Sequence, residues 1–158
     1  MAHHKKEIMK NDDVVITSAF RTAIGSLNGS LSSKKAPELG SAVIKKCVEN
    51  SVLKKEEVDM VYMGQVLTAG VGQNPARQAA ILAELSNETS NTTVNQVCGS
   101  GLASVALAYN SIKSGDGKIM IAGGQESMTN APHYINLRKG KKMRKAKMQD
   151  SMIIDGLW

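Results

Sequence analysis

The 158-residue chain contains few aromatic side chains, since Trp, Tyr and Phe together make up 3% of it. Hydrophobic residues nevertheless reach 42% and charged residues 22%, proportions that are normal for a globular protein. A chain of this length can enclose one hydrophobic core. We therefore predict a single core built from Ala, Val, Leu, Ile and Met rather than from aromatic rings.

Long apolar runs and abundant cysteine are also lacking. No stretch approaches the roughly 20 apolar residues of a membrane span, and the N-terminal "MAHHKKEIMKNDD" has no apolar signal region. The two cysteines, Cys47 and Cys98, have no metal-ligand spacing to each other or to the three histidines. We expect reduced thiols, no metal, no membrane partner and a cytoplasmic location.

The basic excess is confined to one segment. Lys and Arg number 20 against 14 Asp and Glu, and "RKGKKMRKAK" at 138–147 holds seven basic residues and no acid. The simplest interpretation is a solvent-exposed loop. Binding of an anionic ligand, a nucleic acid or an acidic partner surface remains an open alternative at this point.

Strand and helix patterns alternate along most of the chain. β-branched and apolar runs predict strands at 14–20, 58–67, 92–97 and 118–124. Helices are predicted from Pro37, from Pro75 after an Asn74 cap, and over 100–113 with Gly115 after the end. This order is typical of an α/β layered fold with a mainly parallel sheet and helices on both faces.

One cysteine stands where the third predicted strand gives way to the third helix. A helix N-terminus carries partial positive charge and free N–H groups, which favour a thiolate at Cys98 and could hold an oxyanion. Gly99 and Gly101 would leave room for a substrate beside the sulfur. Alternatively, Cys98 is packed and the glycines serve close helix–strand contact. Cys47 lies on the apolar face of its predicted helix and is expected in the core.

Several long motifs resemble those of the thiolase family. "NQVCGSG" around Cys98 is similar to the family's acyl-accepting cysteine motif. In the same order along the chain, "RTAIGSLNGSL", "VLTAGVGQNPARQAA", "AGGQESMTNAPHY" and "MIIDGLW" resemble further thiolase segments. The resemblance spans residues 14–158 and is strongest to the acetoacetyl-CoA thiolase branch, that is, acetyl-CoA acetyltransferases.

The resemblance implies a thiolase-like layered fold and acetyl transfer between coenzyme A thioesters. Two acetyl-CoA molecules would give acetoacetyl-CoA and coenzyme A, reversibly, through an acetyl-Cys98 intermediate. The thioester is the substrate and no cofactor is implied. Gly99 and Gly101 would belong to the oxyanion region and pocket, together with the Cys98 N–H, and Leu157 would line the coenzyme A pocket.

The resemblance also implies an assembly. A dimer-contact loop would contain Gln73, Asn74 and Arg77, in a homo-oligomer that is a dimer or a tetramer. The segment from His133 to Met148 would serve tetramer assembly, with the basic run 138–147 meeting another subunit or the coenzyme A phosphates. A complementary carboxy-terminal half is another possible partner, and nucleic acid is not expected.

Other thiolase elements have no counterpart here. The family also uses an activating His, an Asn–His pair and a second catalytic Cys, all from the second half of its chain. We therefore expect an N-terminal extension at 1–13, an amino-terminal α/β domain at 14–125 without its last strand, the start of a loop domain at 126–158, and no carboxy-terminal domain. Weak or no turnover follows, because general base catalysis contributes about 10²–10⁴-fold.

Two alternatives to this interpretation stay open. The chain could be a condensing enzyme of the ketoacyl-synthase type, although "CGSG" and "GQNPARQ" speak against it. It could instead be a non-catalytic chain that binds coenzyme A, protein or nucleic acid through 138–147. The outer side of the apolar helix at 102–112 would be exposed, which marks a partner site or an aggregation hazard.

Overall fold

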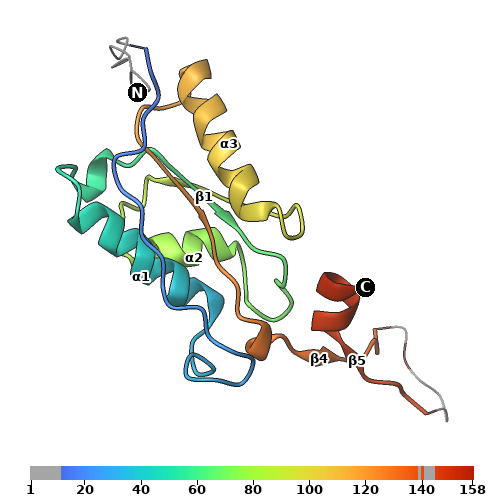
Figure 1. Cartoon of the computed structure of the whole chain (residues 1–158). Coiled ribbons are helices and arrows are strands. Elements are labelled where there is room, and N and C mark those ends of the chain that lie inside the picture. Colours follow the sequence, from blue (N-terminus) through green and yellow to red (C-terminus); the bar gives the residue numbers. More distant parts are fainter. Residues whose placement is uncertain (1–11, 139, 141–144) are drawn as a thin grey trace, which may run out of the picture.

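A three-stranded parallel sheet forms the centre of the computed structural model, which describes residues 12–138, 140 and 145–158. Its strands are β1 (Met60–Gly64), β2 (Ser90–Val94) and β3 (Met120–Gly124), in the order β2-β1-β3. In register, Met60 lies opposite Ser90 and Met120, and Gly64 lies opposite Val94 and Gly124. The carboxyl ends of all three strands therefore meet at one edge of the sheet (Figure 1).

Three helices cover the two faces of this sheet. α1 (Ala36–Glu49) and α2 (Pro75–Leu82) lie on one face, and α3 (Ser100–Ser114) lies on the other (Figure 1). Each begins close to its predicted start. The remaining elements are short: η1 (Lys55–Glu57), η2 (Met128–Asn130), the antiparallel pair β4 (His133–Tyr134) and β5 (Gln149–Asp150), and the helical turn η3 (Ile153–Leu157). The predicted α/β layered architecture is confirmed.

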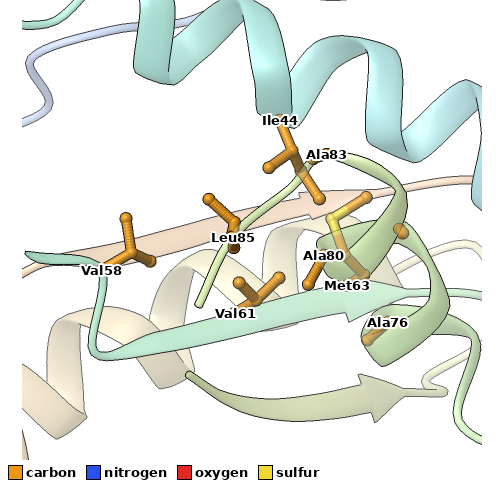
Figure 2. Close-up of a cluster of buried hydrophobic side chains, with 9 residues drawn as sticks. Ile44, Val58, Val61, Met63, Ala76, Ala80, Ala83 and Leu85 are labelled. Carbon is orange, nitrogen blue, oxygen red and sulfur yellow. The ribbon is translucent and has the colours of Figure 1, made fainter. Parts of the chain in front are cut away.

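The hydrophobic core lies between the sheet and the helices α1 and α2 (Figure 2). It is aliphatic, as predicted from the scarcity of aromatic residues. Its fully buried members are Ile44, Val58, Val61, Met63, Ala76, Ala79, Ala80, Ala83 and Leu85. Because α2 contributes only alanines to this set, it lies close against β1 and β2. The larger side chains come from α1, from β1 and from the connecting segments that hold Val58 and Leu85. Cys47 is half-buried on α1, near this core rather than inside it.

The opposite face of the sheet is packed with small side chains. α3 buries Ser100, Ser104, Ala108 and Ser111, which recur every three or four residues along one side of the helix. Two of the hydroxyls form hydrogen bonds inside this layer: Ser104 Oγ donates to the Ser100 carbonyl over 3.0 Å, and Ser111 Oγ lies 2.8 Å from Tyr62 Oη. The small side chains allow α3 to lie close to the sheet.

The larger apolar side chains of α3 point outward. Leu102 is 78% exposed, and Val105, Leu107 and Tyr109 are also exposed. The expected exposed apolar side of residues 102–112 is therefore present. It is this side, and not the side that faces the sheet, that carries the bulky residues of the helix.

Three glycines set the position of α3 on the sheet. A Cβ at Gly64 would lie 2.6 Å from the Ser100 carbonyl carbon and 2.7 Å from the Gly101 nitrogen. A Cβ at Gly124 would lie 3.4 Å from the Gly101 Cα. The first turn of α3 thus lies against the backbone at the carboxyl ends of β1 and β3. A side chain at Gly64 would prevent this approach, whereas a Cβ at Gly124 would make an ordinary contact.

The predicted strand at 14–20 is wrong. This segment is extended but forms no strand, and Ile16 is 80% exposed instead of moderately buried. Its neighbourhood is fixed on either side by Lys113 Nζ, which donates to the Asp12 carbonyl, and by Asn28 N–H, which donates to Thr129 Oγ1. A β-branched sequence favours extended backbone, but a strand also needs a neighbouring strand in register, and the described residues supply none here.

Other predicted boundaries need smaller corrections. β1 and β3 are shorter than 58–67 and 118–124, and β2 ends at Val94, so residues 95–97 belong to the following turn. In the tail after residue 125, where no clear element was expected, only short ones occur. Part of the basic run 138–147, namely 139 and 141–144, lies outside the described residues. No helix in the described ranges is long and apolar enough to cross a membrane.

Replacing Gly64 by Ala should destabilise the protein by about 1–3 kcal/mol or more, because the new methyl group would overlap the backbone of α3. Gly123→Ala is the matched control on β3, since its Cβ would find Met63 Sδ at 3.5 Å, an ordinary contact. Chemical denaturation of the two variants measures the difference. Equal stability losses would contradict the proposed role of the close approach.

Asp59 ties the start of β1 to the start of β3. Its Oδ2 accepts hydrogen bonds from Lys118 N–H (2.7 Å) and Ile119 N–H (3.0 Å). The Ile119 and then the Lys118 amide lower the pKa of the Asp59 carboxyl. A lowered pKa stabilises the folded state above the unfolded-state value and ceases to do so as the pH falls through the folded-state value.

We therefore expect Asp59→Asn to be less stable than the wild-type chain at neutral pH. The gap in unfolding free energy should close as the pH falls below about 3.9, the ordinary pKa of Asp. Urea denaturation at a series of pH values measures this gap. A gap that stayed constant down to the acid limit would show that the two amides do not favour the charged carboxylate.

Candidate functional site

The loops that follow the three strands gather at the carboxyl edge of the sheet. They begin at Gln65 after β1, at Asn95 after β2 and at Gln125 after β3. In parallel α/β sheets, ligands bind outside this edge. The predicted reactive residue, Cys98, lies on the second of these loops, directly before α3.

A tight turn presents Cys98 at the surface. Gly99 N–H donates to the Gln96 carbonyl and Ser100 N–H donates to the Val97 carbonyl, both over 3.0 Å. Val97 has a positive φ of 51°, which is unusual for a β-branched residue. The Cys98 thiol is exposed, whereas Cys47 is half-buried. Of the two open interpretations of Cys98, the structure thus favours an accessible thiol over a packed one.

Gly99 and Gly101 occupy different environments. The Gly99 N–H is used by the turn bond to Gln96, and Gly99 directly precedes the first residue of α3. Gly101 packs against Gly64 and Gly124 in the contact between α3 and the sheet. Gly101 therefore has a packing role that the sequence interpretation offered only as an alternative. Their placement beside the reacting sulfur stays a prediction.

A buried polar cluster braces the neighbouring loops. Gln125 Nε2 donates to Gln65 Oε1 (2.8 Å) and to the Pro75 carbonyl (3.2 Å), and Gln65 Nε2 donates to the Leu67 carbonyl (2.8 Å). A Cβ at Gly40 would overlap Gln125 Oε1, so this glycine on α1 makes room for the amide. The cluster joins the loops after β1 and β3 to the starts of α1 and α2.

Glu126 adds a carboxylate to the same region. It accepts hydrogen bonds from Val66 N–H (2.8 Å) and Leu67 N–H (3.2 Å). Burial raises the pKa of Glu126, and the backbone N–H groups that it accepts from oppose that rise. The sequence analysis gave no role to Glu126 or to the two glutamines. Gln125 and Glu126 lie in the motif "AGGQESMTNAPHY", whereas Gln65 directly precedes "VLTAGVGQNPARQAA", and residue types alone do not reveal which loops meet.

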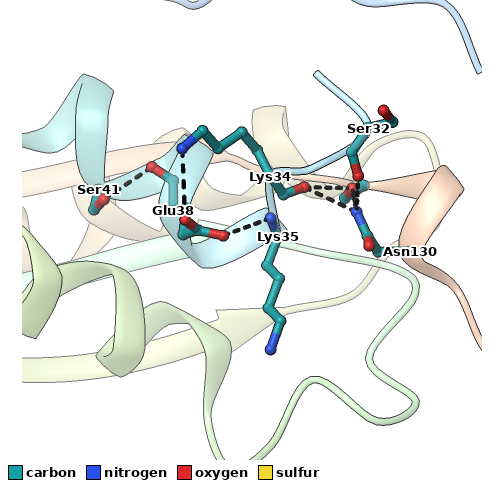
Figure 3. Close-up of polar contacts among 7 residues, drawn as sticks. Ser32, Lys34, Lys35, Glu38, Ser41 and Asn130 are labelled. Carbon is teal, nitrogen blue, oxygen red and sulfur yellow. Dashed lines mark hydrogen bonds and ion pairs between the residues drawn. The ribbon is translucent and has the colours of Figure 1, made fainter. Parts of the chain in front are cut away.

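A cavity of about 80 Å³ lies among these loops and the start of α1. Gln65, Leu67, Ser127 and Asn130 are among its lining residues, and Cys98 is not. The cavity wall is held together by Asn130 Nδ2, which donates to the carbonyls of Ser32 and Lys34 (2.9 and 3.0 Å; Figure 3). The residues before α1 are thereby joined to η2 beside the sheet edge.

The predicted dimer-contact residues lie around the start of α2, next to the outer strand β2. Asn74 caps α2: its Oδ1 accepts from Arg77 N–H (3.3 Å) and Thr93 Oγ (2.9 Å), and its Nδ2 donates to the Asn91 carbonyl (3.0 Å). Arg77 Nη2 donates to the Asn87 carbonyl at 3.3 Å. Gln73 is exposed. A contact between subunits at these residues stays a prediction.

Leu157 lies in η3, the last turn of the chain, and is 63% exposed. The preceding Gly156 packs on the loop after β1, because its Cβ would lie 3.0 Å from Leu67 Cδ2. The buried Ser151 anchors this segment by donating to the Pro132 carbonyl at 2.6 Å. The structure therefore brings the Leu157 turn to the same sheet edge as the cavity loops.

Within the described residues, no group of three or more His, Cys, Asp or Glu side chains could hold a metal ion. The histidine in this part of the chain, His133, lies on β4 with its Nε2 3.6 Å from Asp150 Oδ2 of β5. The side chains around the sheet edge are thus mainly amides, hydroxyls and one carboxylate, together with the exposed thiol of Cys98.

Comparison with protein-family models gives a match to "Thiolase, N-terminal domain" over residues 14–158. The chain is 56% identical over 147 residues to the acetyl-CoA acetyltransferase of Cupriavidus necator, covering 92% of this chain and 37% of that protein. It is 53% identical over 149 residues to the acetyl-CoA acetyltransferase of Rhizobium meliloti, covering 94% of this chain and 38% of that protein. The chain thus spans a little over a third of the length of these relatives.

A solved structure agrees with the sequence relatives. The Acat5 thiolase of Ascaris suum, crystallised in complex with coenzyme A, superimposes with a TM-score of 0.85 at 36% sequence identity. The match covers 89% of this chain and 36% of that one. The thiolase-like fold predicted from the motifs is therefore confirmed.

Asn74→Ala should destabilise the chain by about 1–2 kcal/mol, because it removes a helix cap and leaves alanine at a positive φ of 41°. Gln73→Ala is the neighbouring control: Gln73 is exposed, and its carbonyl still accepts from Gln78 Nε2. It should change stability by less than about 0.5 kcal/mol. Thermal unfolding of both variants at one protein concentration tests this, and equal effects would contradict the capping role.

Proposed function

Since the chain belongs to the thiolase family, whose N-terminal domain model matches residues 14–158, we propose that Cys98 is the acyl-accepting nucleophile of an acetyl-CoA acetyltransferase. The observation that carries the proposal is the position of Cys98, whose exposed thiol lies at the carboxyl edge of a parallel sheet and at the N-terminus of α3. The solved relative bound to coenzyme A supports coenzyme A thioesters as the substrate class.

The proposed chemistry is a covalent transfer in two halves. The Cys98 thiolate attacks the carbonyl carbon of acetyl-CoA, and the tetrahedral intermediate collapses when its C–S bond to coenzyme A breaks. Acetyl-Cys98 and coenzyme A thiolate result, and the thiolate takes up a proton. A second acetyl-CoA loses one Cα proton, which balances the proton taken up by the coenzyme A thiolate, and becomes an enolate. The enolate carbon attacks the carbonyl carbon of acetyl-Cys98, the C–S bond to Cys98 breaks, and acetoacetyl-CoA and the free thiolate result. Both halves are reversible, and no resident cofactor is involved.

The peptide groups at the start of α3 support the first half. They carry the positive end of the helix dipole, which favours negative charge at the sulfur and at the carbonyl oxygen during attack. Leu157 and the loop after β1 would contact coenzyme A, because η3 packs on that loop at the same sheet edge. Gln73, Asn74 and Arg77 would meet a second copy of the chain beside β2.

The ketoacyl-synthase alternative is less well supported than this proposal, since the matched family model and the relatives are thiolases. The alternative of a non-catalytic binder through 138–147 has no structural support, because five of these residues, 139 and 141–144, lie outside the described ranges. The family resemblance assigns the activating histidine and the second cysteine to a later part of the family's chain, so the acetylation half-reaction, and not overall turnover, is the step that tests the role of Cys98.

Acetylation of Cys98 tests the proposal directly. The chain is incubated with acetyl-CoA, and intact-mass and peptide mass spectrometry measure the gain of one acetyl group and its position. We expect acetyl on Cys98 in the wild-type chain and in Cys47→Ala, and none in Cys98→Ala. Label on Cys47, or equal labelling of the two cysteines, would overturn the assignment.

A further inference from the structure

We infer that Ser100 is the positioning residue for Cys98: its buried hydroxyl fixes the turn 95–99 and thereby the direction in which the thiol is presented. The inference rests on the proposed function for its catalytic meaning. The hydrogen bonds that carry it are independent of that function.

The Ser100 hydroxyl holds the turn from both sides. Its Oγ accepts a hydrogen bond from Gln96 N–H at 2.8 Å and donates one to the Val97 carbonyl at 2.6 Å. The first bond is made to the peptide between Asn95 and Gln96, and the second to the peptide between Val97 and Cys98. Ser100 is only 4% exposed, so water has little access to compete for these two hydrogen bonds.

Val97 needs such a restraint. Its φ of 51° lies in the left-handed region, where a β-branched side chain clashes with its own backbone. A further hydrogen bond also restrains Val97: its N–H donates to Asn95 Oδ1 over 3.0 Å. The Val97 side chain is 53% exposed, so hydrophobic burial does not account for its conformation. The strained residue is therefore held by polar bonds around it, chiefly those of Ser100.

The position of Ser100 is itself fixed by the sheet. Ser100 packs directly on Gly64 of β1, because a Cβ on Gly64 would lie 2.7 Å from Ser100 Cβ. The sheet therefore fixes the position of Ser100, and the hydrogen bonds of Ser100 fix the position of the turn. Cys98 lies between Val97 and Ser100 in the sequence. Its side chain takes no part in the hydrogen bonds that fix the turn.

The chain offers a matched control in Ser104. It is also a buried serine on the same side of α3, one turn further on, and its Oγ donates to the Ser100 carbonyl over 3.0 Å. Ser104→Ala and Ser100→Ala each remove one buried hydroxyl from the same layer. Only Ser100→Ala removes bonds from the turn that carries Cys98.

Two readouts separate positioning from stability. Amide hydrogen exchange at Gly99 N–H, which donates to the Gln96 carbonyl, reports whether the turn is formed. The rate of acetylation of Cys98 by acetyl-CoA reports the presentation of the thiol. In Ser100→Ala we expect faster exchange at Gly99 and acetylation slowed by about tenfold to a hundredfold, the cost of a misplaced reacting group. In Ser104→Ala both should stay at wild-type values, although its unfolding free energy falls.

A rescue variant tests how Ser100 acts. Glycine accepts a positive φ without strain, so Val97→Gly removes the need for the restraint. The double variant Val97→Gly, Ser100→Ala should therefore recover much of the wild-type acetylation rate and of the protection at Gly99. Failure of the double variant to recover either quantity would overturn the inference, as would Ser104→Ala matching Ser100→Ala in both.

The outcomes also distinguish this inference from the proposed function. If wild-type Cys98 is not acetylated but Gly99 exchange rises only in Ser100→Ala and is restored in the double variant, the proposed function fails while Ser100 still fixes the turn. If Cys98 is acetylated equally fast in wild type and Ser100→Ala, the proposed function stands and the positioning role is overturned.

Discussion

The backbone contact between α3 and the sheet is the constraint on which the rest of the structure depends. Gly64 of β1, Gly101 of α3 and Gly124 of β3 meet without side chains between them, and this places the first turn of the helix on the carboxyl edge of the sheet. The N-terminal end of the helix is thereby held beside the loops that follow the strands. Cys98 owes its location to this contact, because it directly precedes the part of the chain that the glycines fix.

The same contact explains why the two faces of the sheet are built so differently. The face under α1 and α2 is separated from its helices by Ile44, Met63 and Leu85, which fill a normal aliphatic core. On the other face, α3 approaches so closely that only serine and alanine fit beneath it. The bulky side chains of α3 are therefore turned outward, and Leu102 and Tyr109 form an exposed apolar surface on a chain that spans little more than a third of its relatives.

The sequence predicted the elements whose signals are local. Pro37, Pro75 and Gly115 mark helix ends through their own backbone preferences, and the structure has helices ending or beginning at or next to them. The strand at 14–20 failed because pairing depends on a distant neighbour that residue types do not specify. The predicted strand at 92–97 extends three residues beyond the end of β2 for a related reason: "NQV" favours extended backbone, but hydrogen bonds of the Ser100 hydroxyl hold it in a turn.

The residues of the candidate site show the same difference between local signals, which the sequence reveals, and long-range contacts, which it does not. The order of a strand, a cysteine and glycines in the sequence predicted a cysteine at the start of a helix. It left open whether the thiol is accessible or packed, and the structure shows Cys98 exposed. The cluster of Gln65, Gln125 and Glu126 could not be predicted in this way, because its members come from loops that are about 60 residues apart and meet only through the parallel register of β1 and β3.

The chemistry available to Cys98 within the described residues follows from this geometry. His133 lies beside Asp150 in the β4–β5 pair, and the polar cluster consists of amides and a carboxylate whose own pKa is raised by burial. The start of α3 follows the turn that carries Cys98, and it presents peptide dipoles rather than a basic side chain. Such dipoles are fixed in place and lower the cost of forming an oxyanion, but they do not accept a proton. For the proposed acetyl transfer, the described residues around Cys98 therefore supply peptide dipoles, amides and a carboxylate, and the family resemblance assigns the proton-transferring histidine and cysteine to another part of the family's chain.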